Sequence, residues 1–124
     1  MHEFHITDGE SMTEVFERMK NTVAEIVGQN IGRKIVIVSH GCAIRNYLCY
    51  ANGDGIEGID KVGWADNTAV SMIEYDEELN PSVIYKNNAE HLSNELSTLA
   101  HSAWCKYDDG NFSMNGAYYK EKSK

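Results

Sequence analysis

Behind Ser11 the chain carries apolar side chains at intervals of three and four residues, the pattern of an amphipathic helix. Ser11 and Glu14 have the spacing of a capping box, in which each side chain bonds to the backbone amide of the other residue. Gly28, followed by Asn30, predicts that this helix ends in a loop. The stripe consists of Val15, Met19, Thr22, Val23 and Ile26.

The next segment has a different pattern, a run of four β-branched residues from Ile35 to Val38. Such a run suits a strand that is covered on both faces, so we predict a buried strand over Lys34–Ser39. Gly41 ends that strand, and Cys42–Ala51 is predicted to be a helix. The following segment, Asn52–Gly63, holds four glycines together with Asn and Asp, which predicts a mobile loop.

The second half of the chain alternates more weakly. We predict a strand over Thr68–Tyr75, a turn over Asp76–Pro81 and a third strand that begins at Val83–Tyr85, an arrangement that suits a hairpin. Ser93–Lys106 has helical spacing, with Leu96, Leu99 and Ala103 as its apolar positions. From position 108 to position 124 the chain is polar, which predicts a flexible tail.

This order of elements predicts an α/β fold. A strand, a helix and a further strand imply a right-handed crossover and a parallel pair, with flanking helices and one antiparallel companion strand. The resulting mostly parallel sheet is thin, although the strand over Lys34–Ser39 needs cover on both faces. With 124 residues, the chain is expected to form a single domain over positions 1–124.

Composition narrows the classes of function. The net charge of −8 argues against a sequence-independent grip on nucleic acid or on an anionic membrane. Three cysteines are too few to staple a secreted fold, and the first residues lack the layout of a signal peptide. No apolar run is long enough to cross a bilayer. We therefore expect a cytoplasmic protein with reduced thiols.

Candidate chemistry lies at His40, where the predicted strand gives way to the predicted helix. Ligands of open α/β sheets bind outside the carboxyl ends of the strands, and a helix N-terminus there attracts anions. Gly41 lets the backbone approach a ligand, and the amides of Gly41 and Cys42 would point at an oxyanion. A histidine at this point can donate to a phosphate oxygen. The competing interpretation is that His40 only caps the turn.

A larger set of segments occurs in a recognisable order. It comprises Gly9-Glu10-Ser11, Arg18 on the first helix, Val36-Ile37-Val38-Ser39-His40-Gly41, Ile44-Arg45, Asn67-Thr68-Ala69-Val70-Ser71, Ile73-Glu74-Tyr75, Asn88 and His91-Leu92. In this order, over roughly residues 9 to 92, the sequence resembles the C-terminal half of a histidine phosphatase of the phosphoglycerate-mutase-like superfamily. The segment after Leu92 adds nothing to the resemblance.

The resemblance implies a division of labour within one active site. A nucleophilic histidine in an Arg-His-Gly motif attacks the phosphoryl group, and the resulting phosphohistidine is resolved by water or by a second substrate. His40 corresponds to the second histidine, which holds the phosphate, with Gly41 and Cys42 supplying backbone amides. The substrate is then a small phosphorylated metabolite or inorganic phosphate, and no metal or organic cofactor is implied.

The sequence departs from the family at the nucleophile. Arg-His-Gly does not occur in the 124 residues, and the only His-Gly pair is His40-Gly41. We therefore expect an incomplete three-layer fold that lacks its N-terminal strand, and a chain that is inactive alone. Two alternatives stay open: a non-catalytic phosphate-binding module, and a module that forms homo-oligomers through an exposed sheet edge.

Other residues invite functional hypotheses that we weigh lower. Glu10 is expected to complement the helix dipole rather than to serve as general acid. Arg45, one turn past His40, could reach an anion there, but an arginine at such a position more often forms a surface or structural ion pair. The thiol of Cys42 is expected to be a buried or half-buried group rather than a nucleophile.

The remaining histidines and the acidic stretch have simple structural interpretations. His2 and His5 match a metal-binding spacing only weakly, since no cysteine lies near them. His91 is expected to hold the turn after the last strand. The acidic stretch Glu74–Glu78 lacks the glycine of a calcium loop and is expected to be a solvated turn.

Overall fold

The computed structural model describes residues 2–101, and its first helix is the one with the clearest sequence signal. Helix α1 spans Met12–Gly28, and both halves of the predicted capping box are present. The Glu14 amide donates to Ser11 Oγ at 3.2 Å, and the Ser11 amide donates to Glu14 Oε2 at 2.7 Å. The predicted helix is therefore confirmed, with its N-terminal amides satisfied by two neighbouring side chains.

The second helix, α2, spans Gly41–Ala51 and confirms the helix predicted from Cys42. The glycine-rich segment behind it is more ordered than predicted, because Ile56–Lys61 forms a 3-10 helix, η1. Ile59 within it and Val62 behind it are completely buried. These two apolar side chains anchor a segment whose glycine content alone favoured an irregular loop.

Strands β1, Val70–Tyr75, and β2, Pro81–Asn88, form the predicted hairpin and pair in antiparallel register. Residues 76–80 between them form a turn, as predicted, whereas Glu74 of the acidic stretch lies within β1, and Asp76 organises the turn. Its carboxylate accepts from the backbone amides of Glu78 at 2.9 Å and Asn80 at 2.8 Å. These hydrogen bonds, Asn80 foremost, lower the pKa of Asp76 below its usual value.

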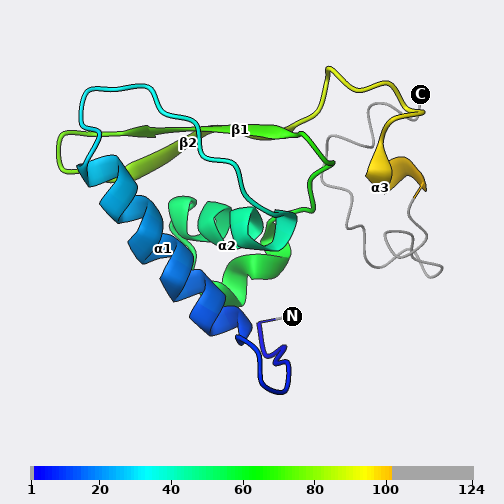
Figure 1. The fold of residues 1–124 in the computed structure, drawn as a ribbon, viewed down its shortest axis with the longest axis horizontal. Coiled ribbons are helices and arrows are strands. Elements are labelled where there is room, and N and C mark those ends of the chain that lie inside the picture. The colour runs from blue at the N-terminus through cyan, green and yellow to red at the C-terminus, as the bar shows by residue number, and fades with distance from the viewer. Residues whose placement is uncertain (1, 102–124) are drawn as a thin grey trace.

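The predicted buried strand over Lys34–Ser39 is wrong as to burial and pairing. The sole sheet in the described part of the chain contains β1 and β2, so the predicted parallel pair does not form. Val36 and Val38 are each 90% exposed, while Ile35 and Ile37 are about 40% exposed. Figure 1 shows the segment crossing as a thin trace from the end of α1 to the start of α2. β-branched residues favour extended backbone, but a strand also needs a hydrogen-bonded neighbour.

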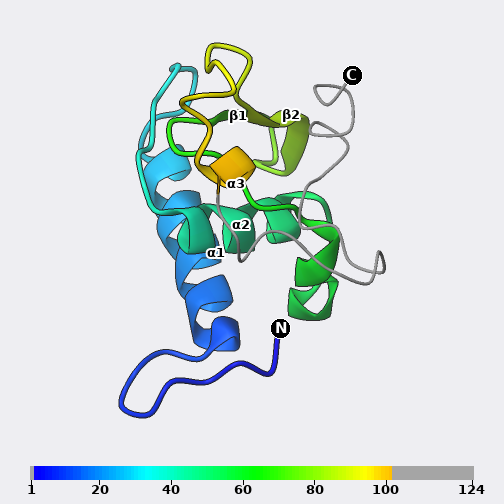
Figure 2. The same cartoon turned by 90° about the vertical axis from the view of Figure 1, so that its right-hand side faces the viewer.

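Both long helices lie on the same side of the hairpin, as two perpendicular views show (Figures 1 and 2). The cross-strand pair Ile73 and Val83 faces the helices and packs against both clusters of buried side chains. One cluster consists of Met12, Phe16, Leu48, Cys49, Ile59 and Val62, and the other of Met19, Val23, Val27, Tyr47, Ala51. Helices and strands are combined as the α/β prediction requires, but in two layers around an antiparallel hairpin.

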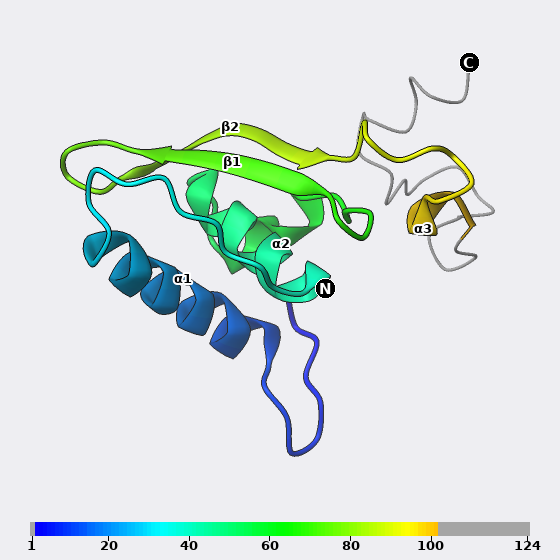
Figure 3. The ribbon, with the colours of Figure 1, turned by 45° about the horizontal axis from the view of Figure 1, so that its top comes forward.

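The end of the described region departs from the sequence prediction. Of the helix predicted over Ser93–Lys106, the structure has α3 at Thr98–His101, and positions 102–106 lie outside the described residues. The predicted tail, 108–124, also lies outside them. Figure 3 shows that α3 follows the end of β2 after an irregular connection. Among the helices of residues 2–101, none has the length and apolarity needed to cross a bilayer.

The burial of Leu48 makes a direct test of this core. Leu48 is 1% exposed and Leu96 is 69% exposed, so the same substitution at both sites separates core packing from residue type. Leu48→Ala is expected to lower the free energy of unfolding by about 2–5 kcal/mol, because it removes buried methyl groups and leaves a cavity. Leu96→Ala is expected to change it by less than about 0.5 kcal/mol. Urea unfolding followed by circular dichroism measures both, and equal losses would contradict this core.

Candidate functional site

At the start of α2, His40 and Gly41 are exposed to solvent. His40 is the N-cap residue, has extended backbone and makes no side-chain capping bond. Its carbonyl accepts the first helical hydrogen bond, from the Ile44 amide at 2.9 Å. The amides of Gly41 and Cys42 precede that bond, so the helix itself supplies no acceptor for them. His40 and Gly41 are both exposed, and the helix dipole adds a partial positive charge there.

The Cys42 side chain turns toward the interior rather than toward this surface. Its Sγ lies 3.8 Å from Met12 Sδ, and Asn46 Nδ2 approaches the Cys42 carbonyl oxygen at 2.9 Å and its sulfur at 3.7 Å. Cys42 is half-buried, which matches the structural interpretation of its thiol. What Cys42 offers at the start of α2 is therefore its backbone amide.

Arg45 is buried behind the helix start and holds the neighbouring loop. It is 3% exposed, and its Nε donates to the Val62 carbonyl at 2.6 Å and its Nη2 to the Ile59 carbonyl at 2.9 Å. Asp60 Oδ1 lies 3.7 Å from the same guanidinium. Burial lowers the pKa of Arg45, and the negative charge of Asp60 opposes that shift. Arg45 thus has the structural role that the sequence analysis favoured for it.

Trp64 completes this arrangement, and the sequence analysis did not single it out. The guanidinium carbon of Arg45 lies 4.7 Å from the centre of the Trp64 ring, which is a cation–π contact. The same ring borders Gly41, because a Cβ built there would lie 3.9 Å from Trp64 Cζ3. A lone tryptophan after a glycine-rich segment was the sequence signal, and it is a weak one.

The segment after Trp64 is fastened to the C-terminal part of the described chain. Asp66 is buried and accepts from Ser97 Oγ at 2.9 Å and from the Leu99 amide at 2.9 Å. His91 Nε2 lies 3.0 Å from Thr68 Oγ1, so His91 joins the loop before β1 to the turn after β2. The predicted structural role of His91 is confirmed.

The other candidates from the sequence lie in ordinary surface contacts. Glu10 forms a two-pronged ion pair with Arg18, with both N–O distances at 2.6 Å, and this contact lowers the pKa of Glu10. His2 approaches Glu3 at 3.9 Å, and His5 is exposed. Within residues 2–101, no cluster of three or more His, Cys, Asp or Glu side chains is placed to hold a metal ion.

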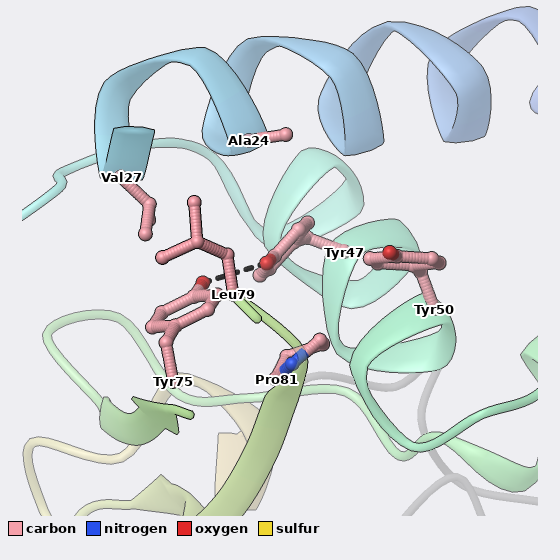
Figure 4. Close-up of a pocket in the computed structure, with 7 residues that line it drawn as sticks. All are labelled: Ala24, Val27, Tyr47, Tyr50, Tyr75, Leu79 and Pro81. Carbon is pink, nitrogen blue, oxygen red and sulfur yellow. Dashed lines mark hydrogen bonds between the residues drawn. The ribbon is translucent and has the colours of Figure 1, made fainter. Parts of the chain in front are cut away.

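A small apolar hollow of about 60 Å³ lies elsewhere, beside the second half of α2. Figure 4 shows the hydroxyl groups of Tyr47 and Tyr75 directed at each other across it, 2.6 Å apart. Burial raises the pKa of both hydroxyl groups, so neither is an acid or base near neutral pH. The lining is Ala24, Val27, Tyr47, Tyr50, Tyr75, Leu79 and Pro81. This chemistry does not suit a phosphate, which leaves the start of α2 as the candidate anion site.

The region containing this helix start has a family assignment. Residues 1–88 match the family described as the histidine phosphatase superfamily (branch 1). The chain belongs to this superfamily. The resemblance drawn from the order of the sequence motifs is therefore confirmed.

The chain is also similar to a curated protein. The chain is 29% identical over 102 residues to phosphoserine phosphatase 1 of Hydrogenobacter thermophilus, an alignment that covers 82% of this chain and 47% of that protein. The chain thus spans about half the length of this curated relative. Within the region that matches the superfamily, the adjacent exposed residues His40 and Gly41 at the start of α2 are the candidate phosphate-binding residues.

Removal of the Arg45 guanidinium tests what holds this region together. Arg45→Ala leaves the buried Val62 and Ile59 carbonyls without these donors, so the free energy of unfolding is expected to fall by about 3 kcal/mol. Arg33 is exposed, and Arg33→Ala is expected to cost less than about 0.5 kcal/mol. Urea titration of both variants measures the difference. If Arg45→Ala left the free energy of unfolding almost unchanged, the buried hydrogen bonds of Arg45 would not be what holds the loop.

Proposed function

We propose that this chain supplies the phosphate-binding half of a histidine phosphatase site. His40 donates a hydrogen bond to a phosphoryl oxygen, and the amides of Gly41 and Cys42 hold the other oxygens. The substrate is a phosphomonoester, such as a small phosphorylated metabolite, and the product is inorganic phosphate. The name of the Hydrogenobacter relative, a phosphoserine phosphatase, supports this substrate class.

One observation carries the proposal. His40 stands exposed at the junction of an extended segment and α2, with no side-chain bond to its own helix, inside the region that matches the superfamily. A histidine that merely capped the helix would bond to one of its first amides. The free imidazole, the exposed glycine and the positive end of the helix together suit a doubly charged oxyanion.

The reaction needs a nucleophilic histidine besides His40, and the 124 residues contain no Arg-His-Gly motif to supply it. In the proposed reaction a histidine nitrogen attacks phosphorus, the bond from phosphorus to the ester oxygen breaks, and an acid protonates the departing alkoxide. Water then attacks the phosphohistidine and releases phosphate. His40 stabilises the charge on the transferred group in both steps, which is the main demand of phosphoryl transfer. The nucleophile comes from an Arg-His-Gly segment outside this sequence.

This division predicts binding without turnover. We expect the chain alone to bind inorganic phosphate and to hydrolyse p-nitrophenyl phosphate no faster than the buffer does. His40→Ala is expected to weaken phosphate binding about tenfold, since it removes a charge-assisted hydrogen bond. His5→Ala is the matched control, because His5 is exposed and lies outside the proposed site. Calorimetric titration measures binding, and release of p-nitrophenol measures turnover.

Two results would contradict the proposal. Hydrolysis by the pure chain that disappears in His40→Ala would show that no second histidine segment is needed. Equal phosphate affinity in the parent chain and in His40→Ala would remove His40 from the site. Binding without turnover is also what a non-catalytic phosphate-binding module would show, and supplying an Arg-His-Gly segment in trans separates that role from the enzymatic one.

A second candidate function is assembly, and the exposed side chains of residues 35–38 favour it. Val36 and Val38 are each 90% exposed in an extended segment that belongs to no sheet of the described residues. Such a segment presents unpaired backbone groups together with apolar side chains, and both favour pairing with a strand of another copy. Homo-oligomers would then form through residues 35–38.

Sedimentation velocity tests this assembly. Val36→Lys is expected to shift the chain toward monomer, because a charged side chain disfavours edge pairing. Ile84→Lys is the matched control, since Ile84 is 51% exposed on the outer face of the hairpin. A parent chain that sediments as a monomer at high concentration, or a dimer that Val36→Lys leaves intact, would refute assembly through this segment.

A further inference from the structure

Trp64 borders the proposed phosphate site without belonging to its hydrogen-bonding groups. A Cβ built on Gly41 would lie 3.9 Å from Trp64 Cζ3 and 4.0 Å from Cε3, which is ordinary van der Waals distance. The six-membered side of the indole therefore lies against the first residue of α2. Since Gly41 directly follows His40, the indole adjoins the residues that we propose hold the phosphate.

The indole is held firmly in that place. Val62 and Gly63 precede Trp64 in the chain, and the carbonyl of each accepts a hydrogen bond. Arg45 Nε donates to the Val62 carbonyl at 2.6 Å, and Asn87 Nδ2 donates to the Gly63 carbonyl at 3.1 Å. Asp66, two residues further on, is bonded to Ser97 and to the Leu99 amide. The chain is thus fixed on both sides of Trp64, so the indole belongs to an ordered segment rather than to a mobile cover.

The electrostatics of the indole suit its position beside an anion. The Arg45 guanidinium carbon lies 4.7 Å from the ring centre, so the negative face of the ring is turned to a buried cation. The rim of an aromatic ring carries the positive part of its quadrupole, and Cζ3 and Cε3 on that rim are the indole atoms nearest to the Gly41 position. The rim therefore tolerates a phosphate and offers apolar contact to the carbon atoms attached to it.

We propose that Trp64 is a specificity-determining residue that packs against the alcohol group of a phosphomonoester bound at His40, and so favours esters of a large, aromatic alcohol over esters of a small one. The inference rests on the proposed function, because it assumes the phosphate site at the start of α2. It adds a substrate preference that the phosphate-holding groups cannot supply, since they contact only oxygen atoms. Trp64 recognises the group that distinguishes one phosphomonoester from another.

The preference is measurable as a difference between two esters of equal charge. The parent chain is titrated calorimetrically with phenyl phosphate, methyl phosphate and inorganic phosphate. Phenyl phosphate is expected to bind about tenfold more tightly than methyl phosphate. Trp64→Ala is expected to abolish this ratio and leave methyl phosphate affinity unchanged, and Trp64→Phe is expected to retain most of the ratio. A loss of affinity for both esters in equal measure would overturn the inference, because a merely structural role predicts that.

A fluorescence measurement tests the same contact if Trp64→Ala does not fold. The sequence has two tryptophans, so in Trp104→Phe the fluorescence comes from Trp64. Phenyl phosphate is expected to change that fluorescence more than methyl phosphate at equal occupancy, and identical responses would refute the contact. Binding of inorganic phosphate separates the two ideas. If inorganic phosphate binds and the two esters bind equally, the Trp64 contact is refuted and the phosphate site is not. If inorganic phosphate does not bind, both the contact and the site are refuted.

Discussion

The buried guanidinium of Arg45 is the interaction on which the rest of the site depends. It bonds to the Val62 and Ile59 carbonyls and stacks on Trp64, so it joins α2 to the loop that borders the start of that helix. A buried cation is costly unless its donors are satisfied, and here backbone carbonyls satisfy them. The helix start, the loop and the indole consequently form one unit, with the exposed residues His40 and Gly41 at its surface.

The sequence predicted well those elements that local chemistry determines. Ser11 and Glu14 fix the start of α1 through bonds three residues apart, and the acidic turn before Pro81 fixes the hairpin through the Asp76 carboxylate. The order of short motifs was sufficient for the family, which the match over residues 1–88 confirms. His40 was singled out as a candidate in the same way, because a histidine and a glycine between an extended run and a helix form a pattern within one short stretch.

The features that the sequence did not predict depend on contacts between distant residues. The run around Val36 has the composition of a covered strand, yet cover depends on a neighbour that no local pattern reveals. The sequence around Arg45 does not predict its hydrogen bond to Val62, because the two residues are 17 positions apart. Trp64 could not be placed against Gly41 from spacing, because a glycine-rich segment of unpredicted path separates them. Each of these outcomes is a tertiary effect.

The residues of the proposed phosphate site therefore differ in how firmly the rest of the structure holds their backbone. The amides of Gly41 and Cys42 belong to a helix that is packed against α1, η1 and β2, and Trp64 is fixed by bonds on both sides. His40, in contrast, ends a segment that no strand of the described residues supports. A strand paired with residues 34–39 would restrict the backbone that carries the imidazole. A ligand held by His40 would in turn favour the paired state, since coupling between two sites is reciprocal. If His40 binds phosphate and residues 34–39 pair with a strand, each event would then be expected to strengthen the other.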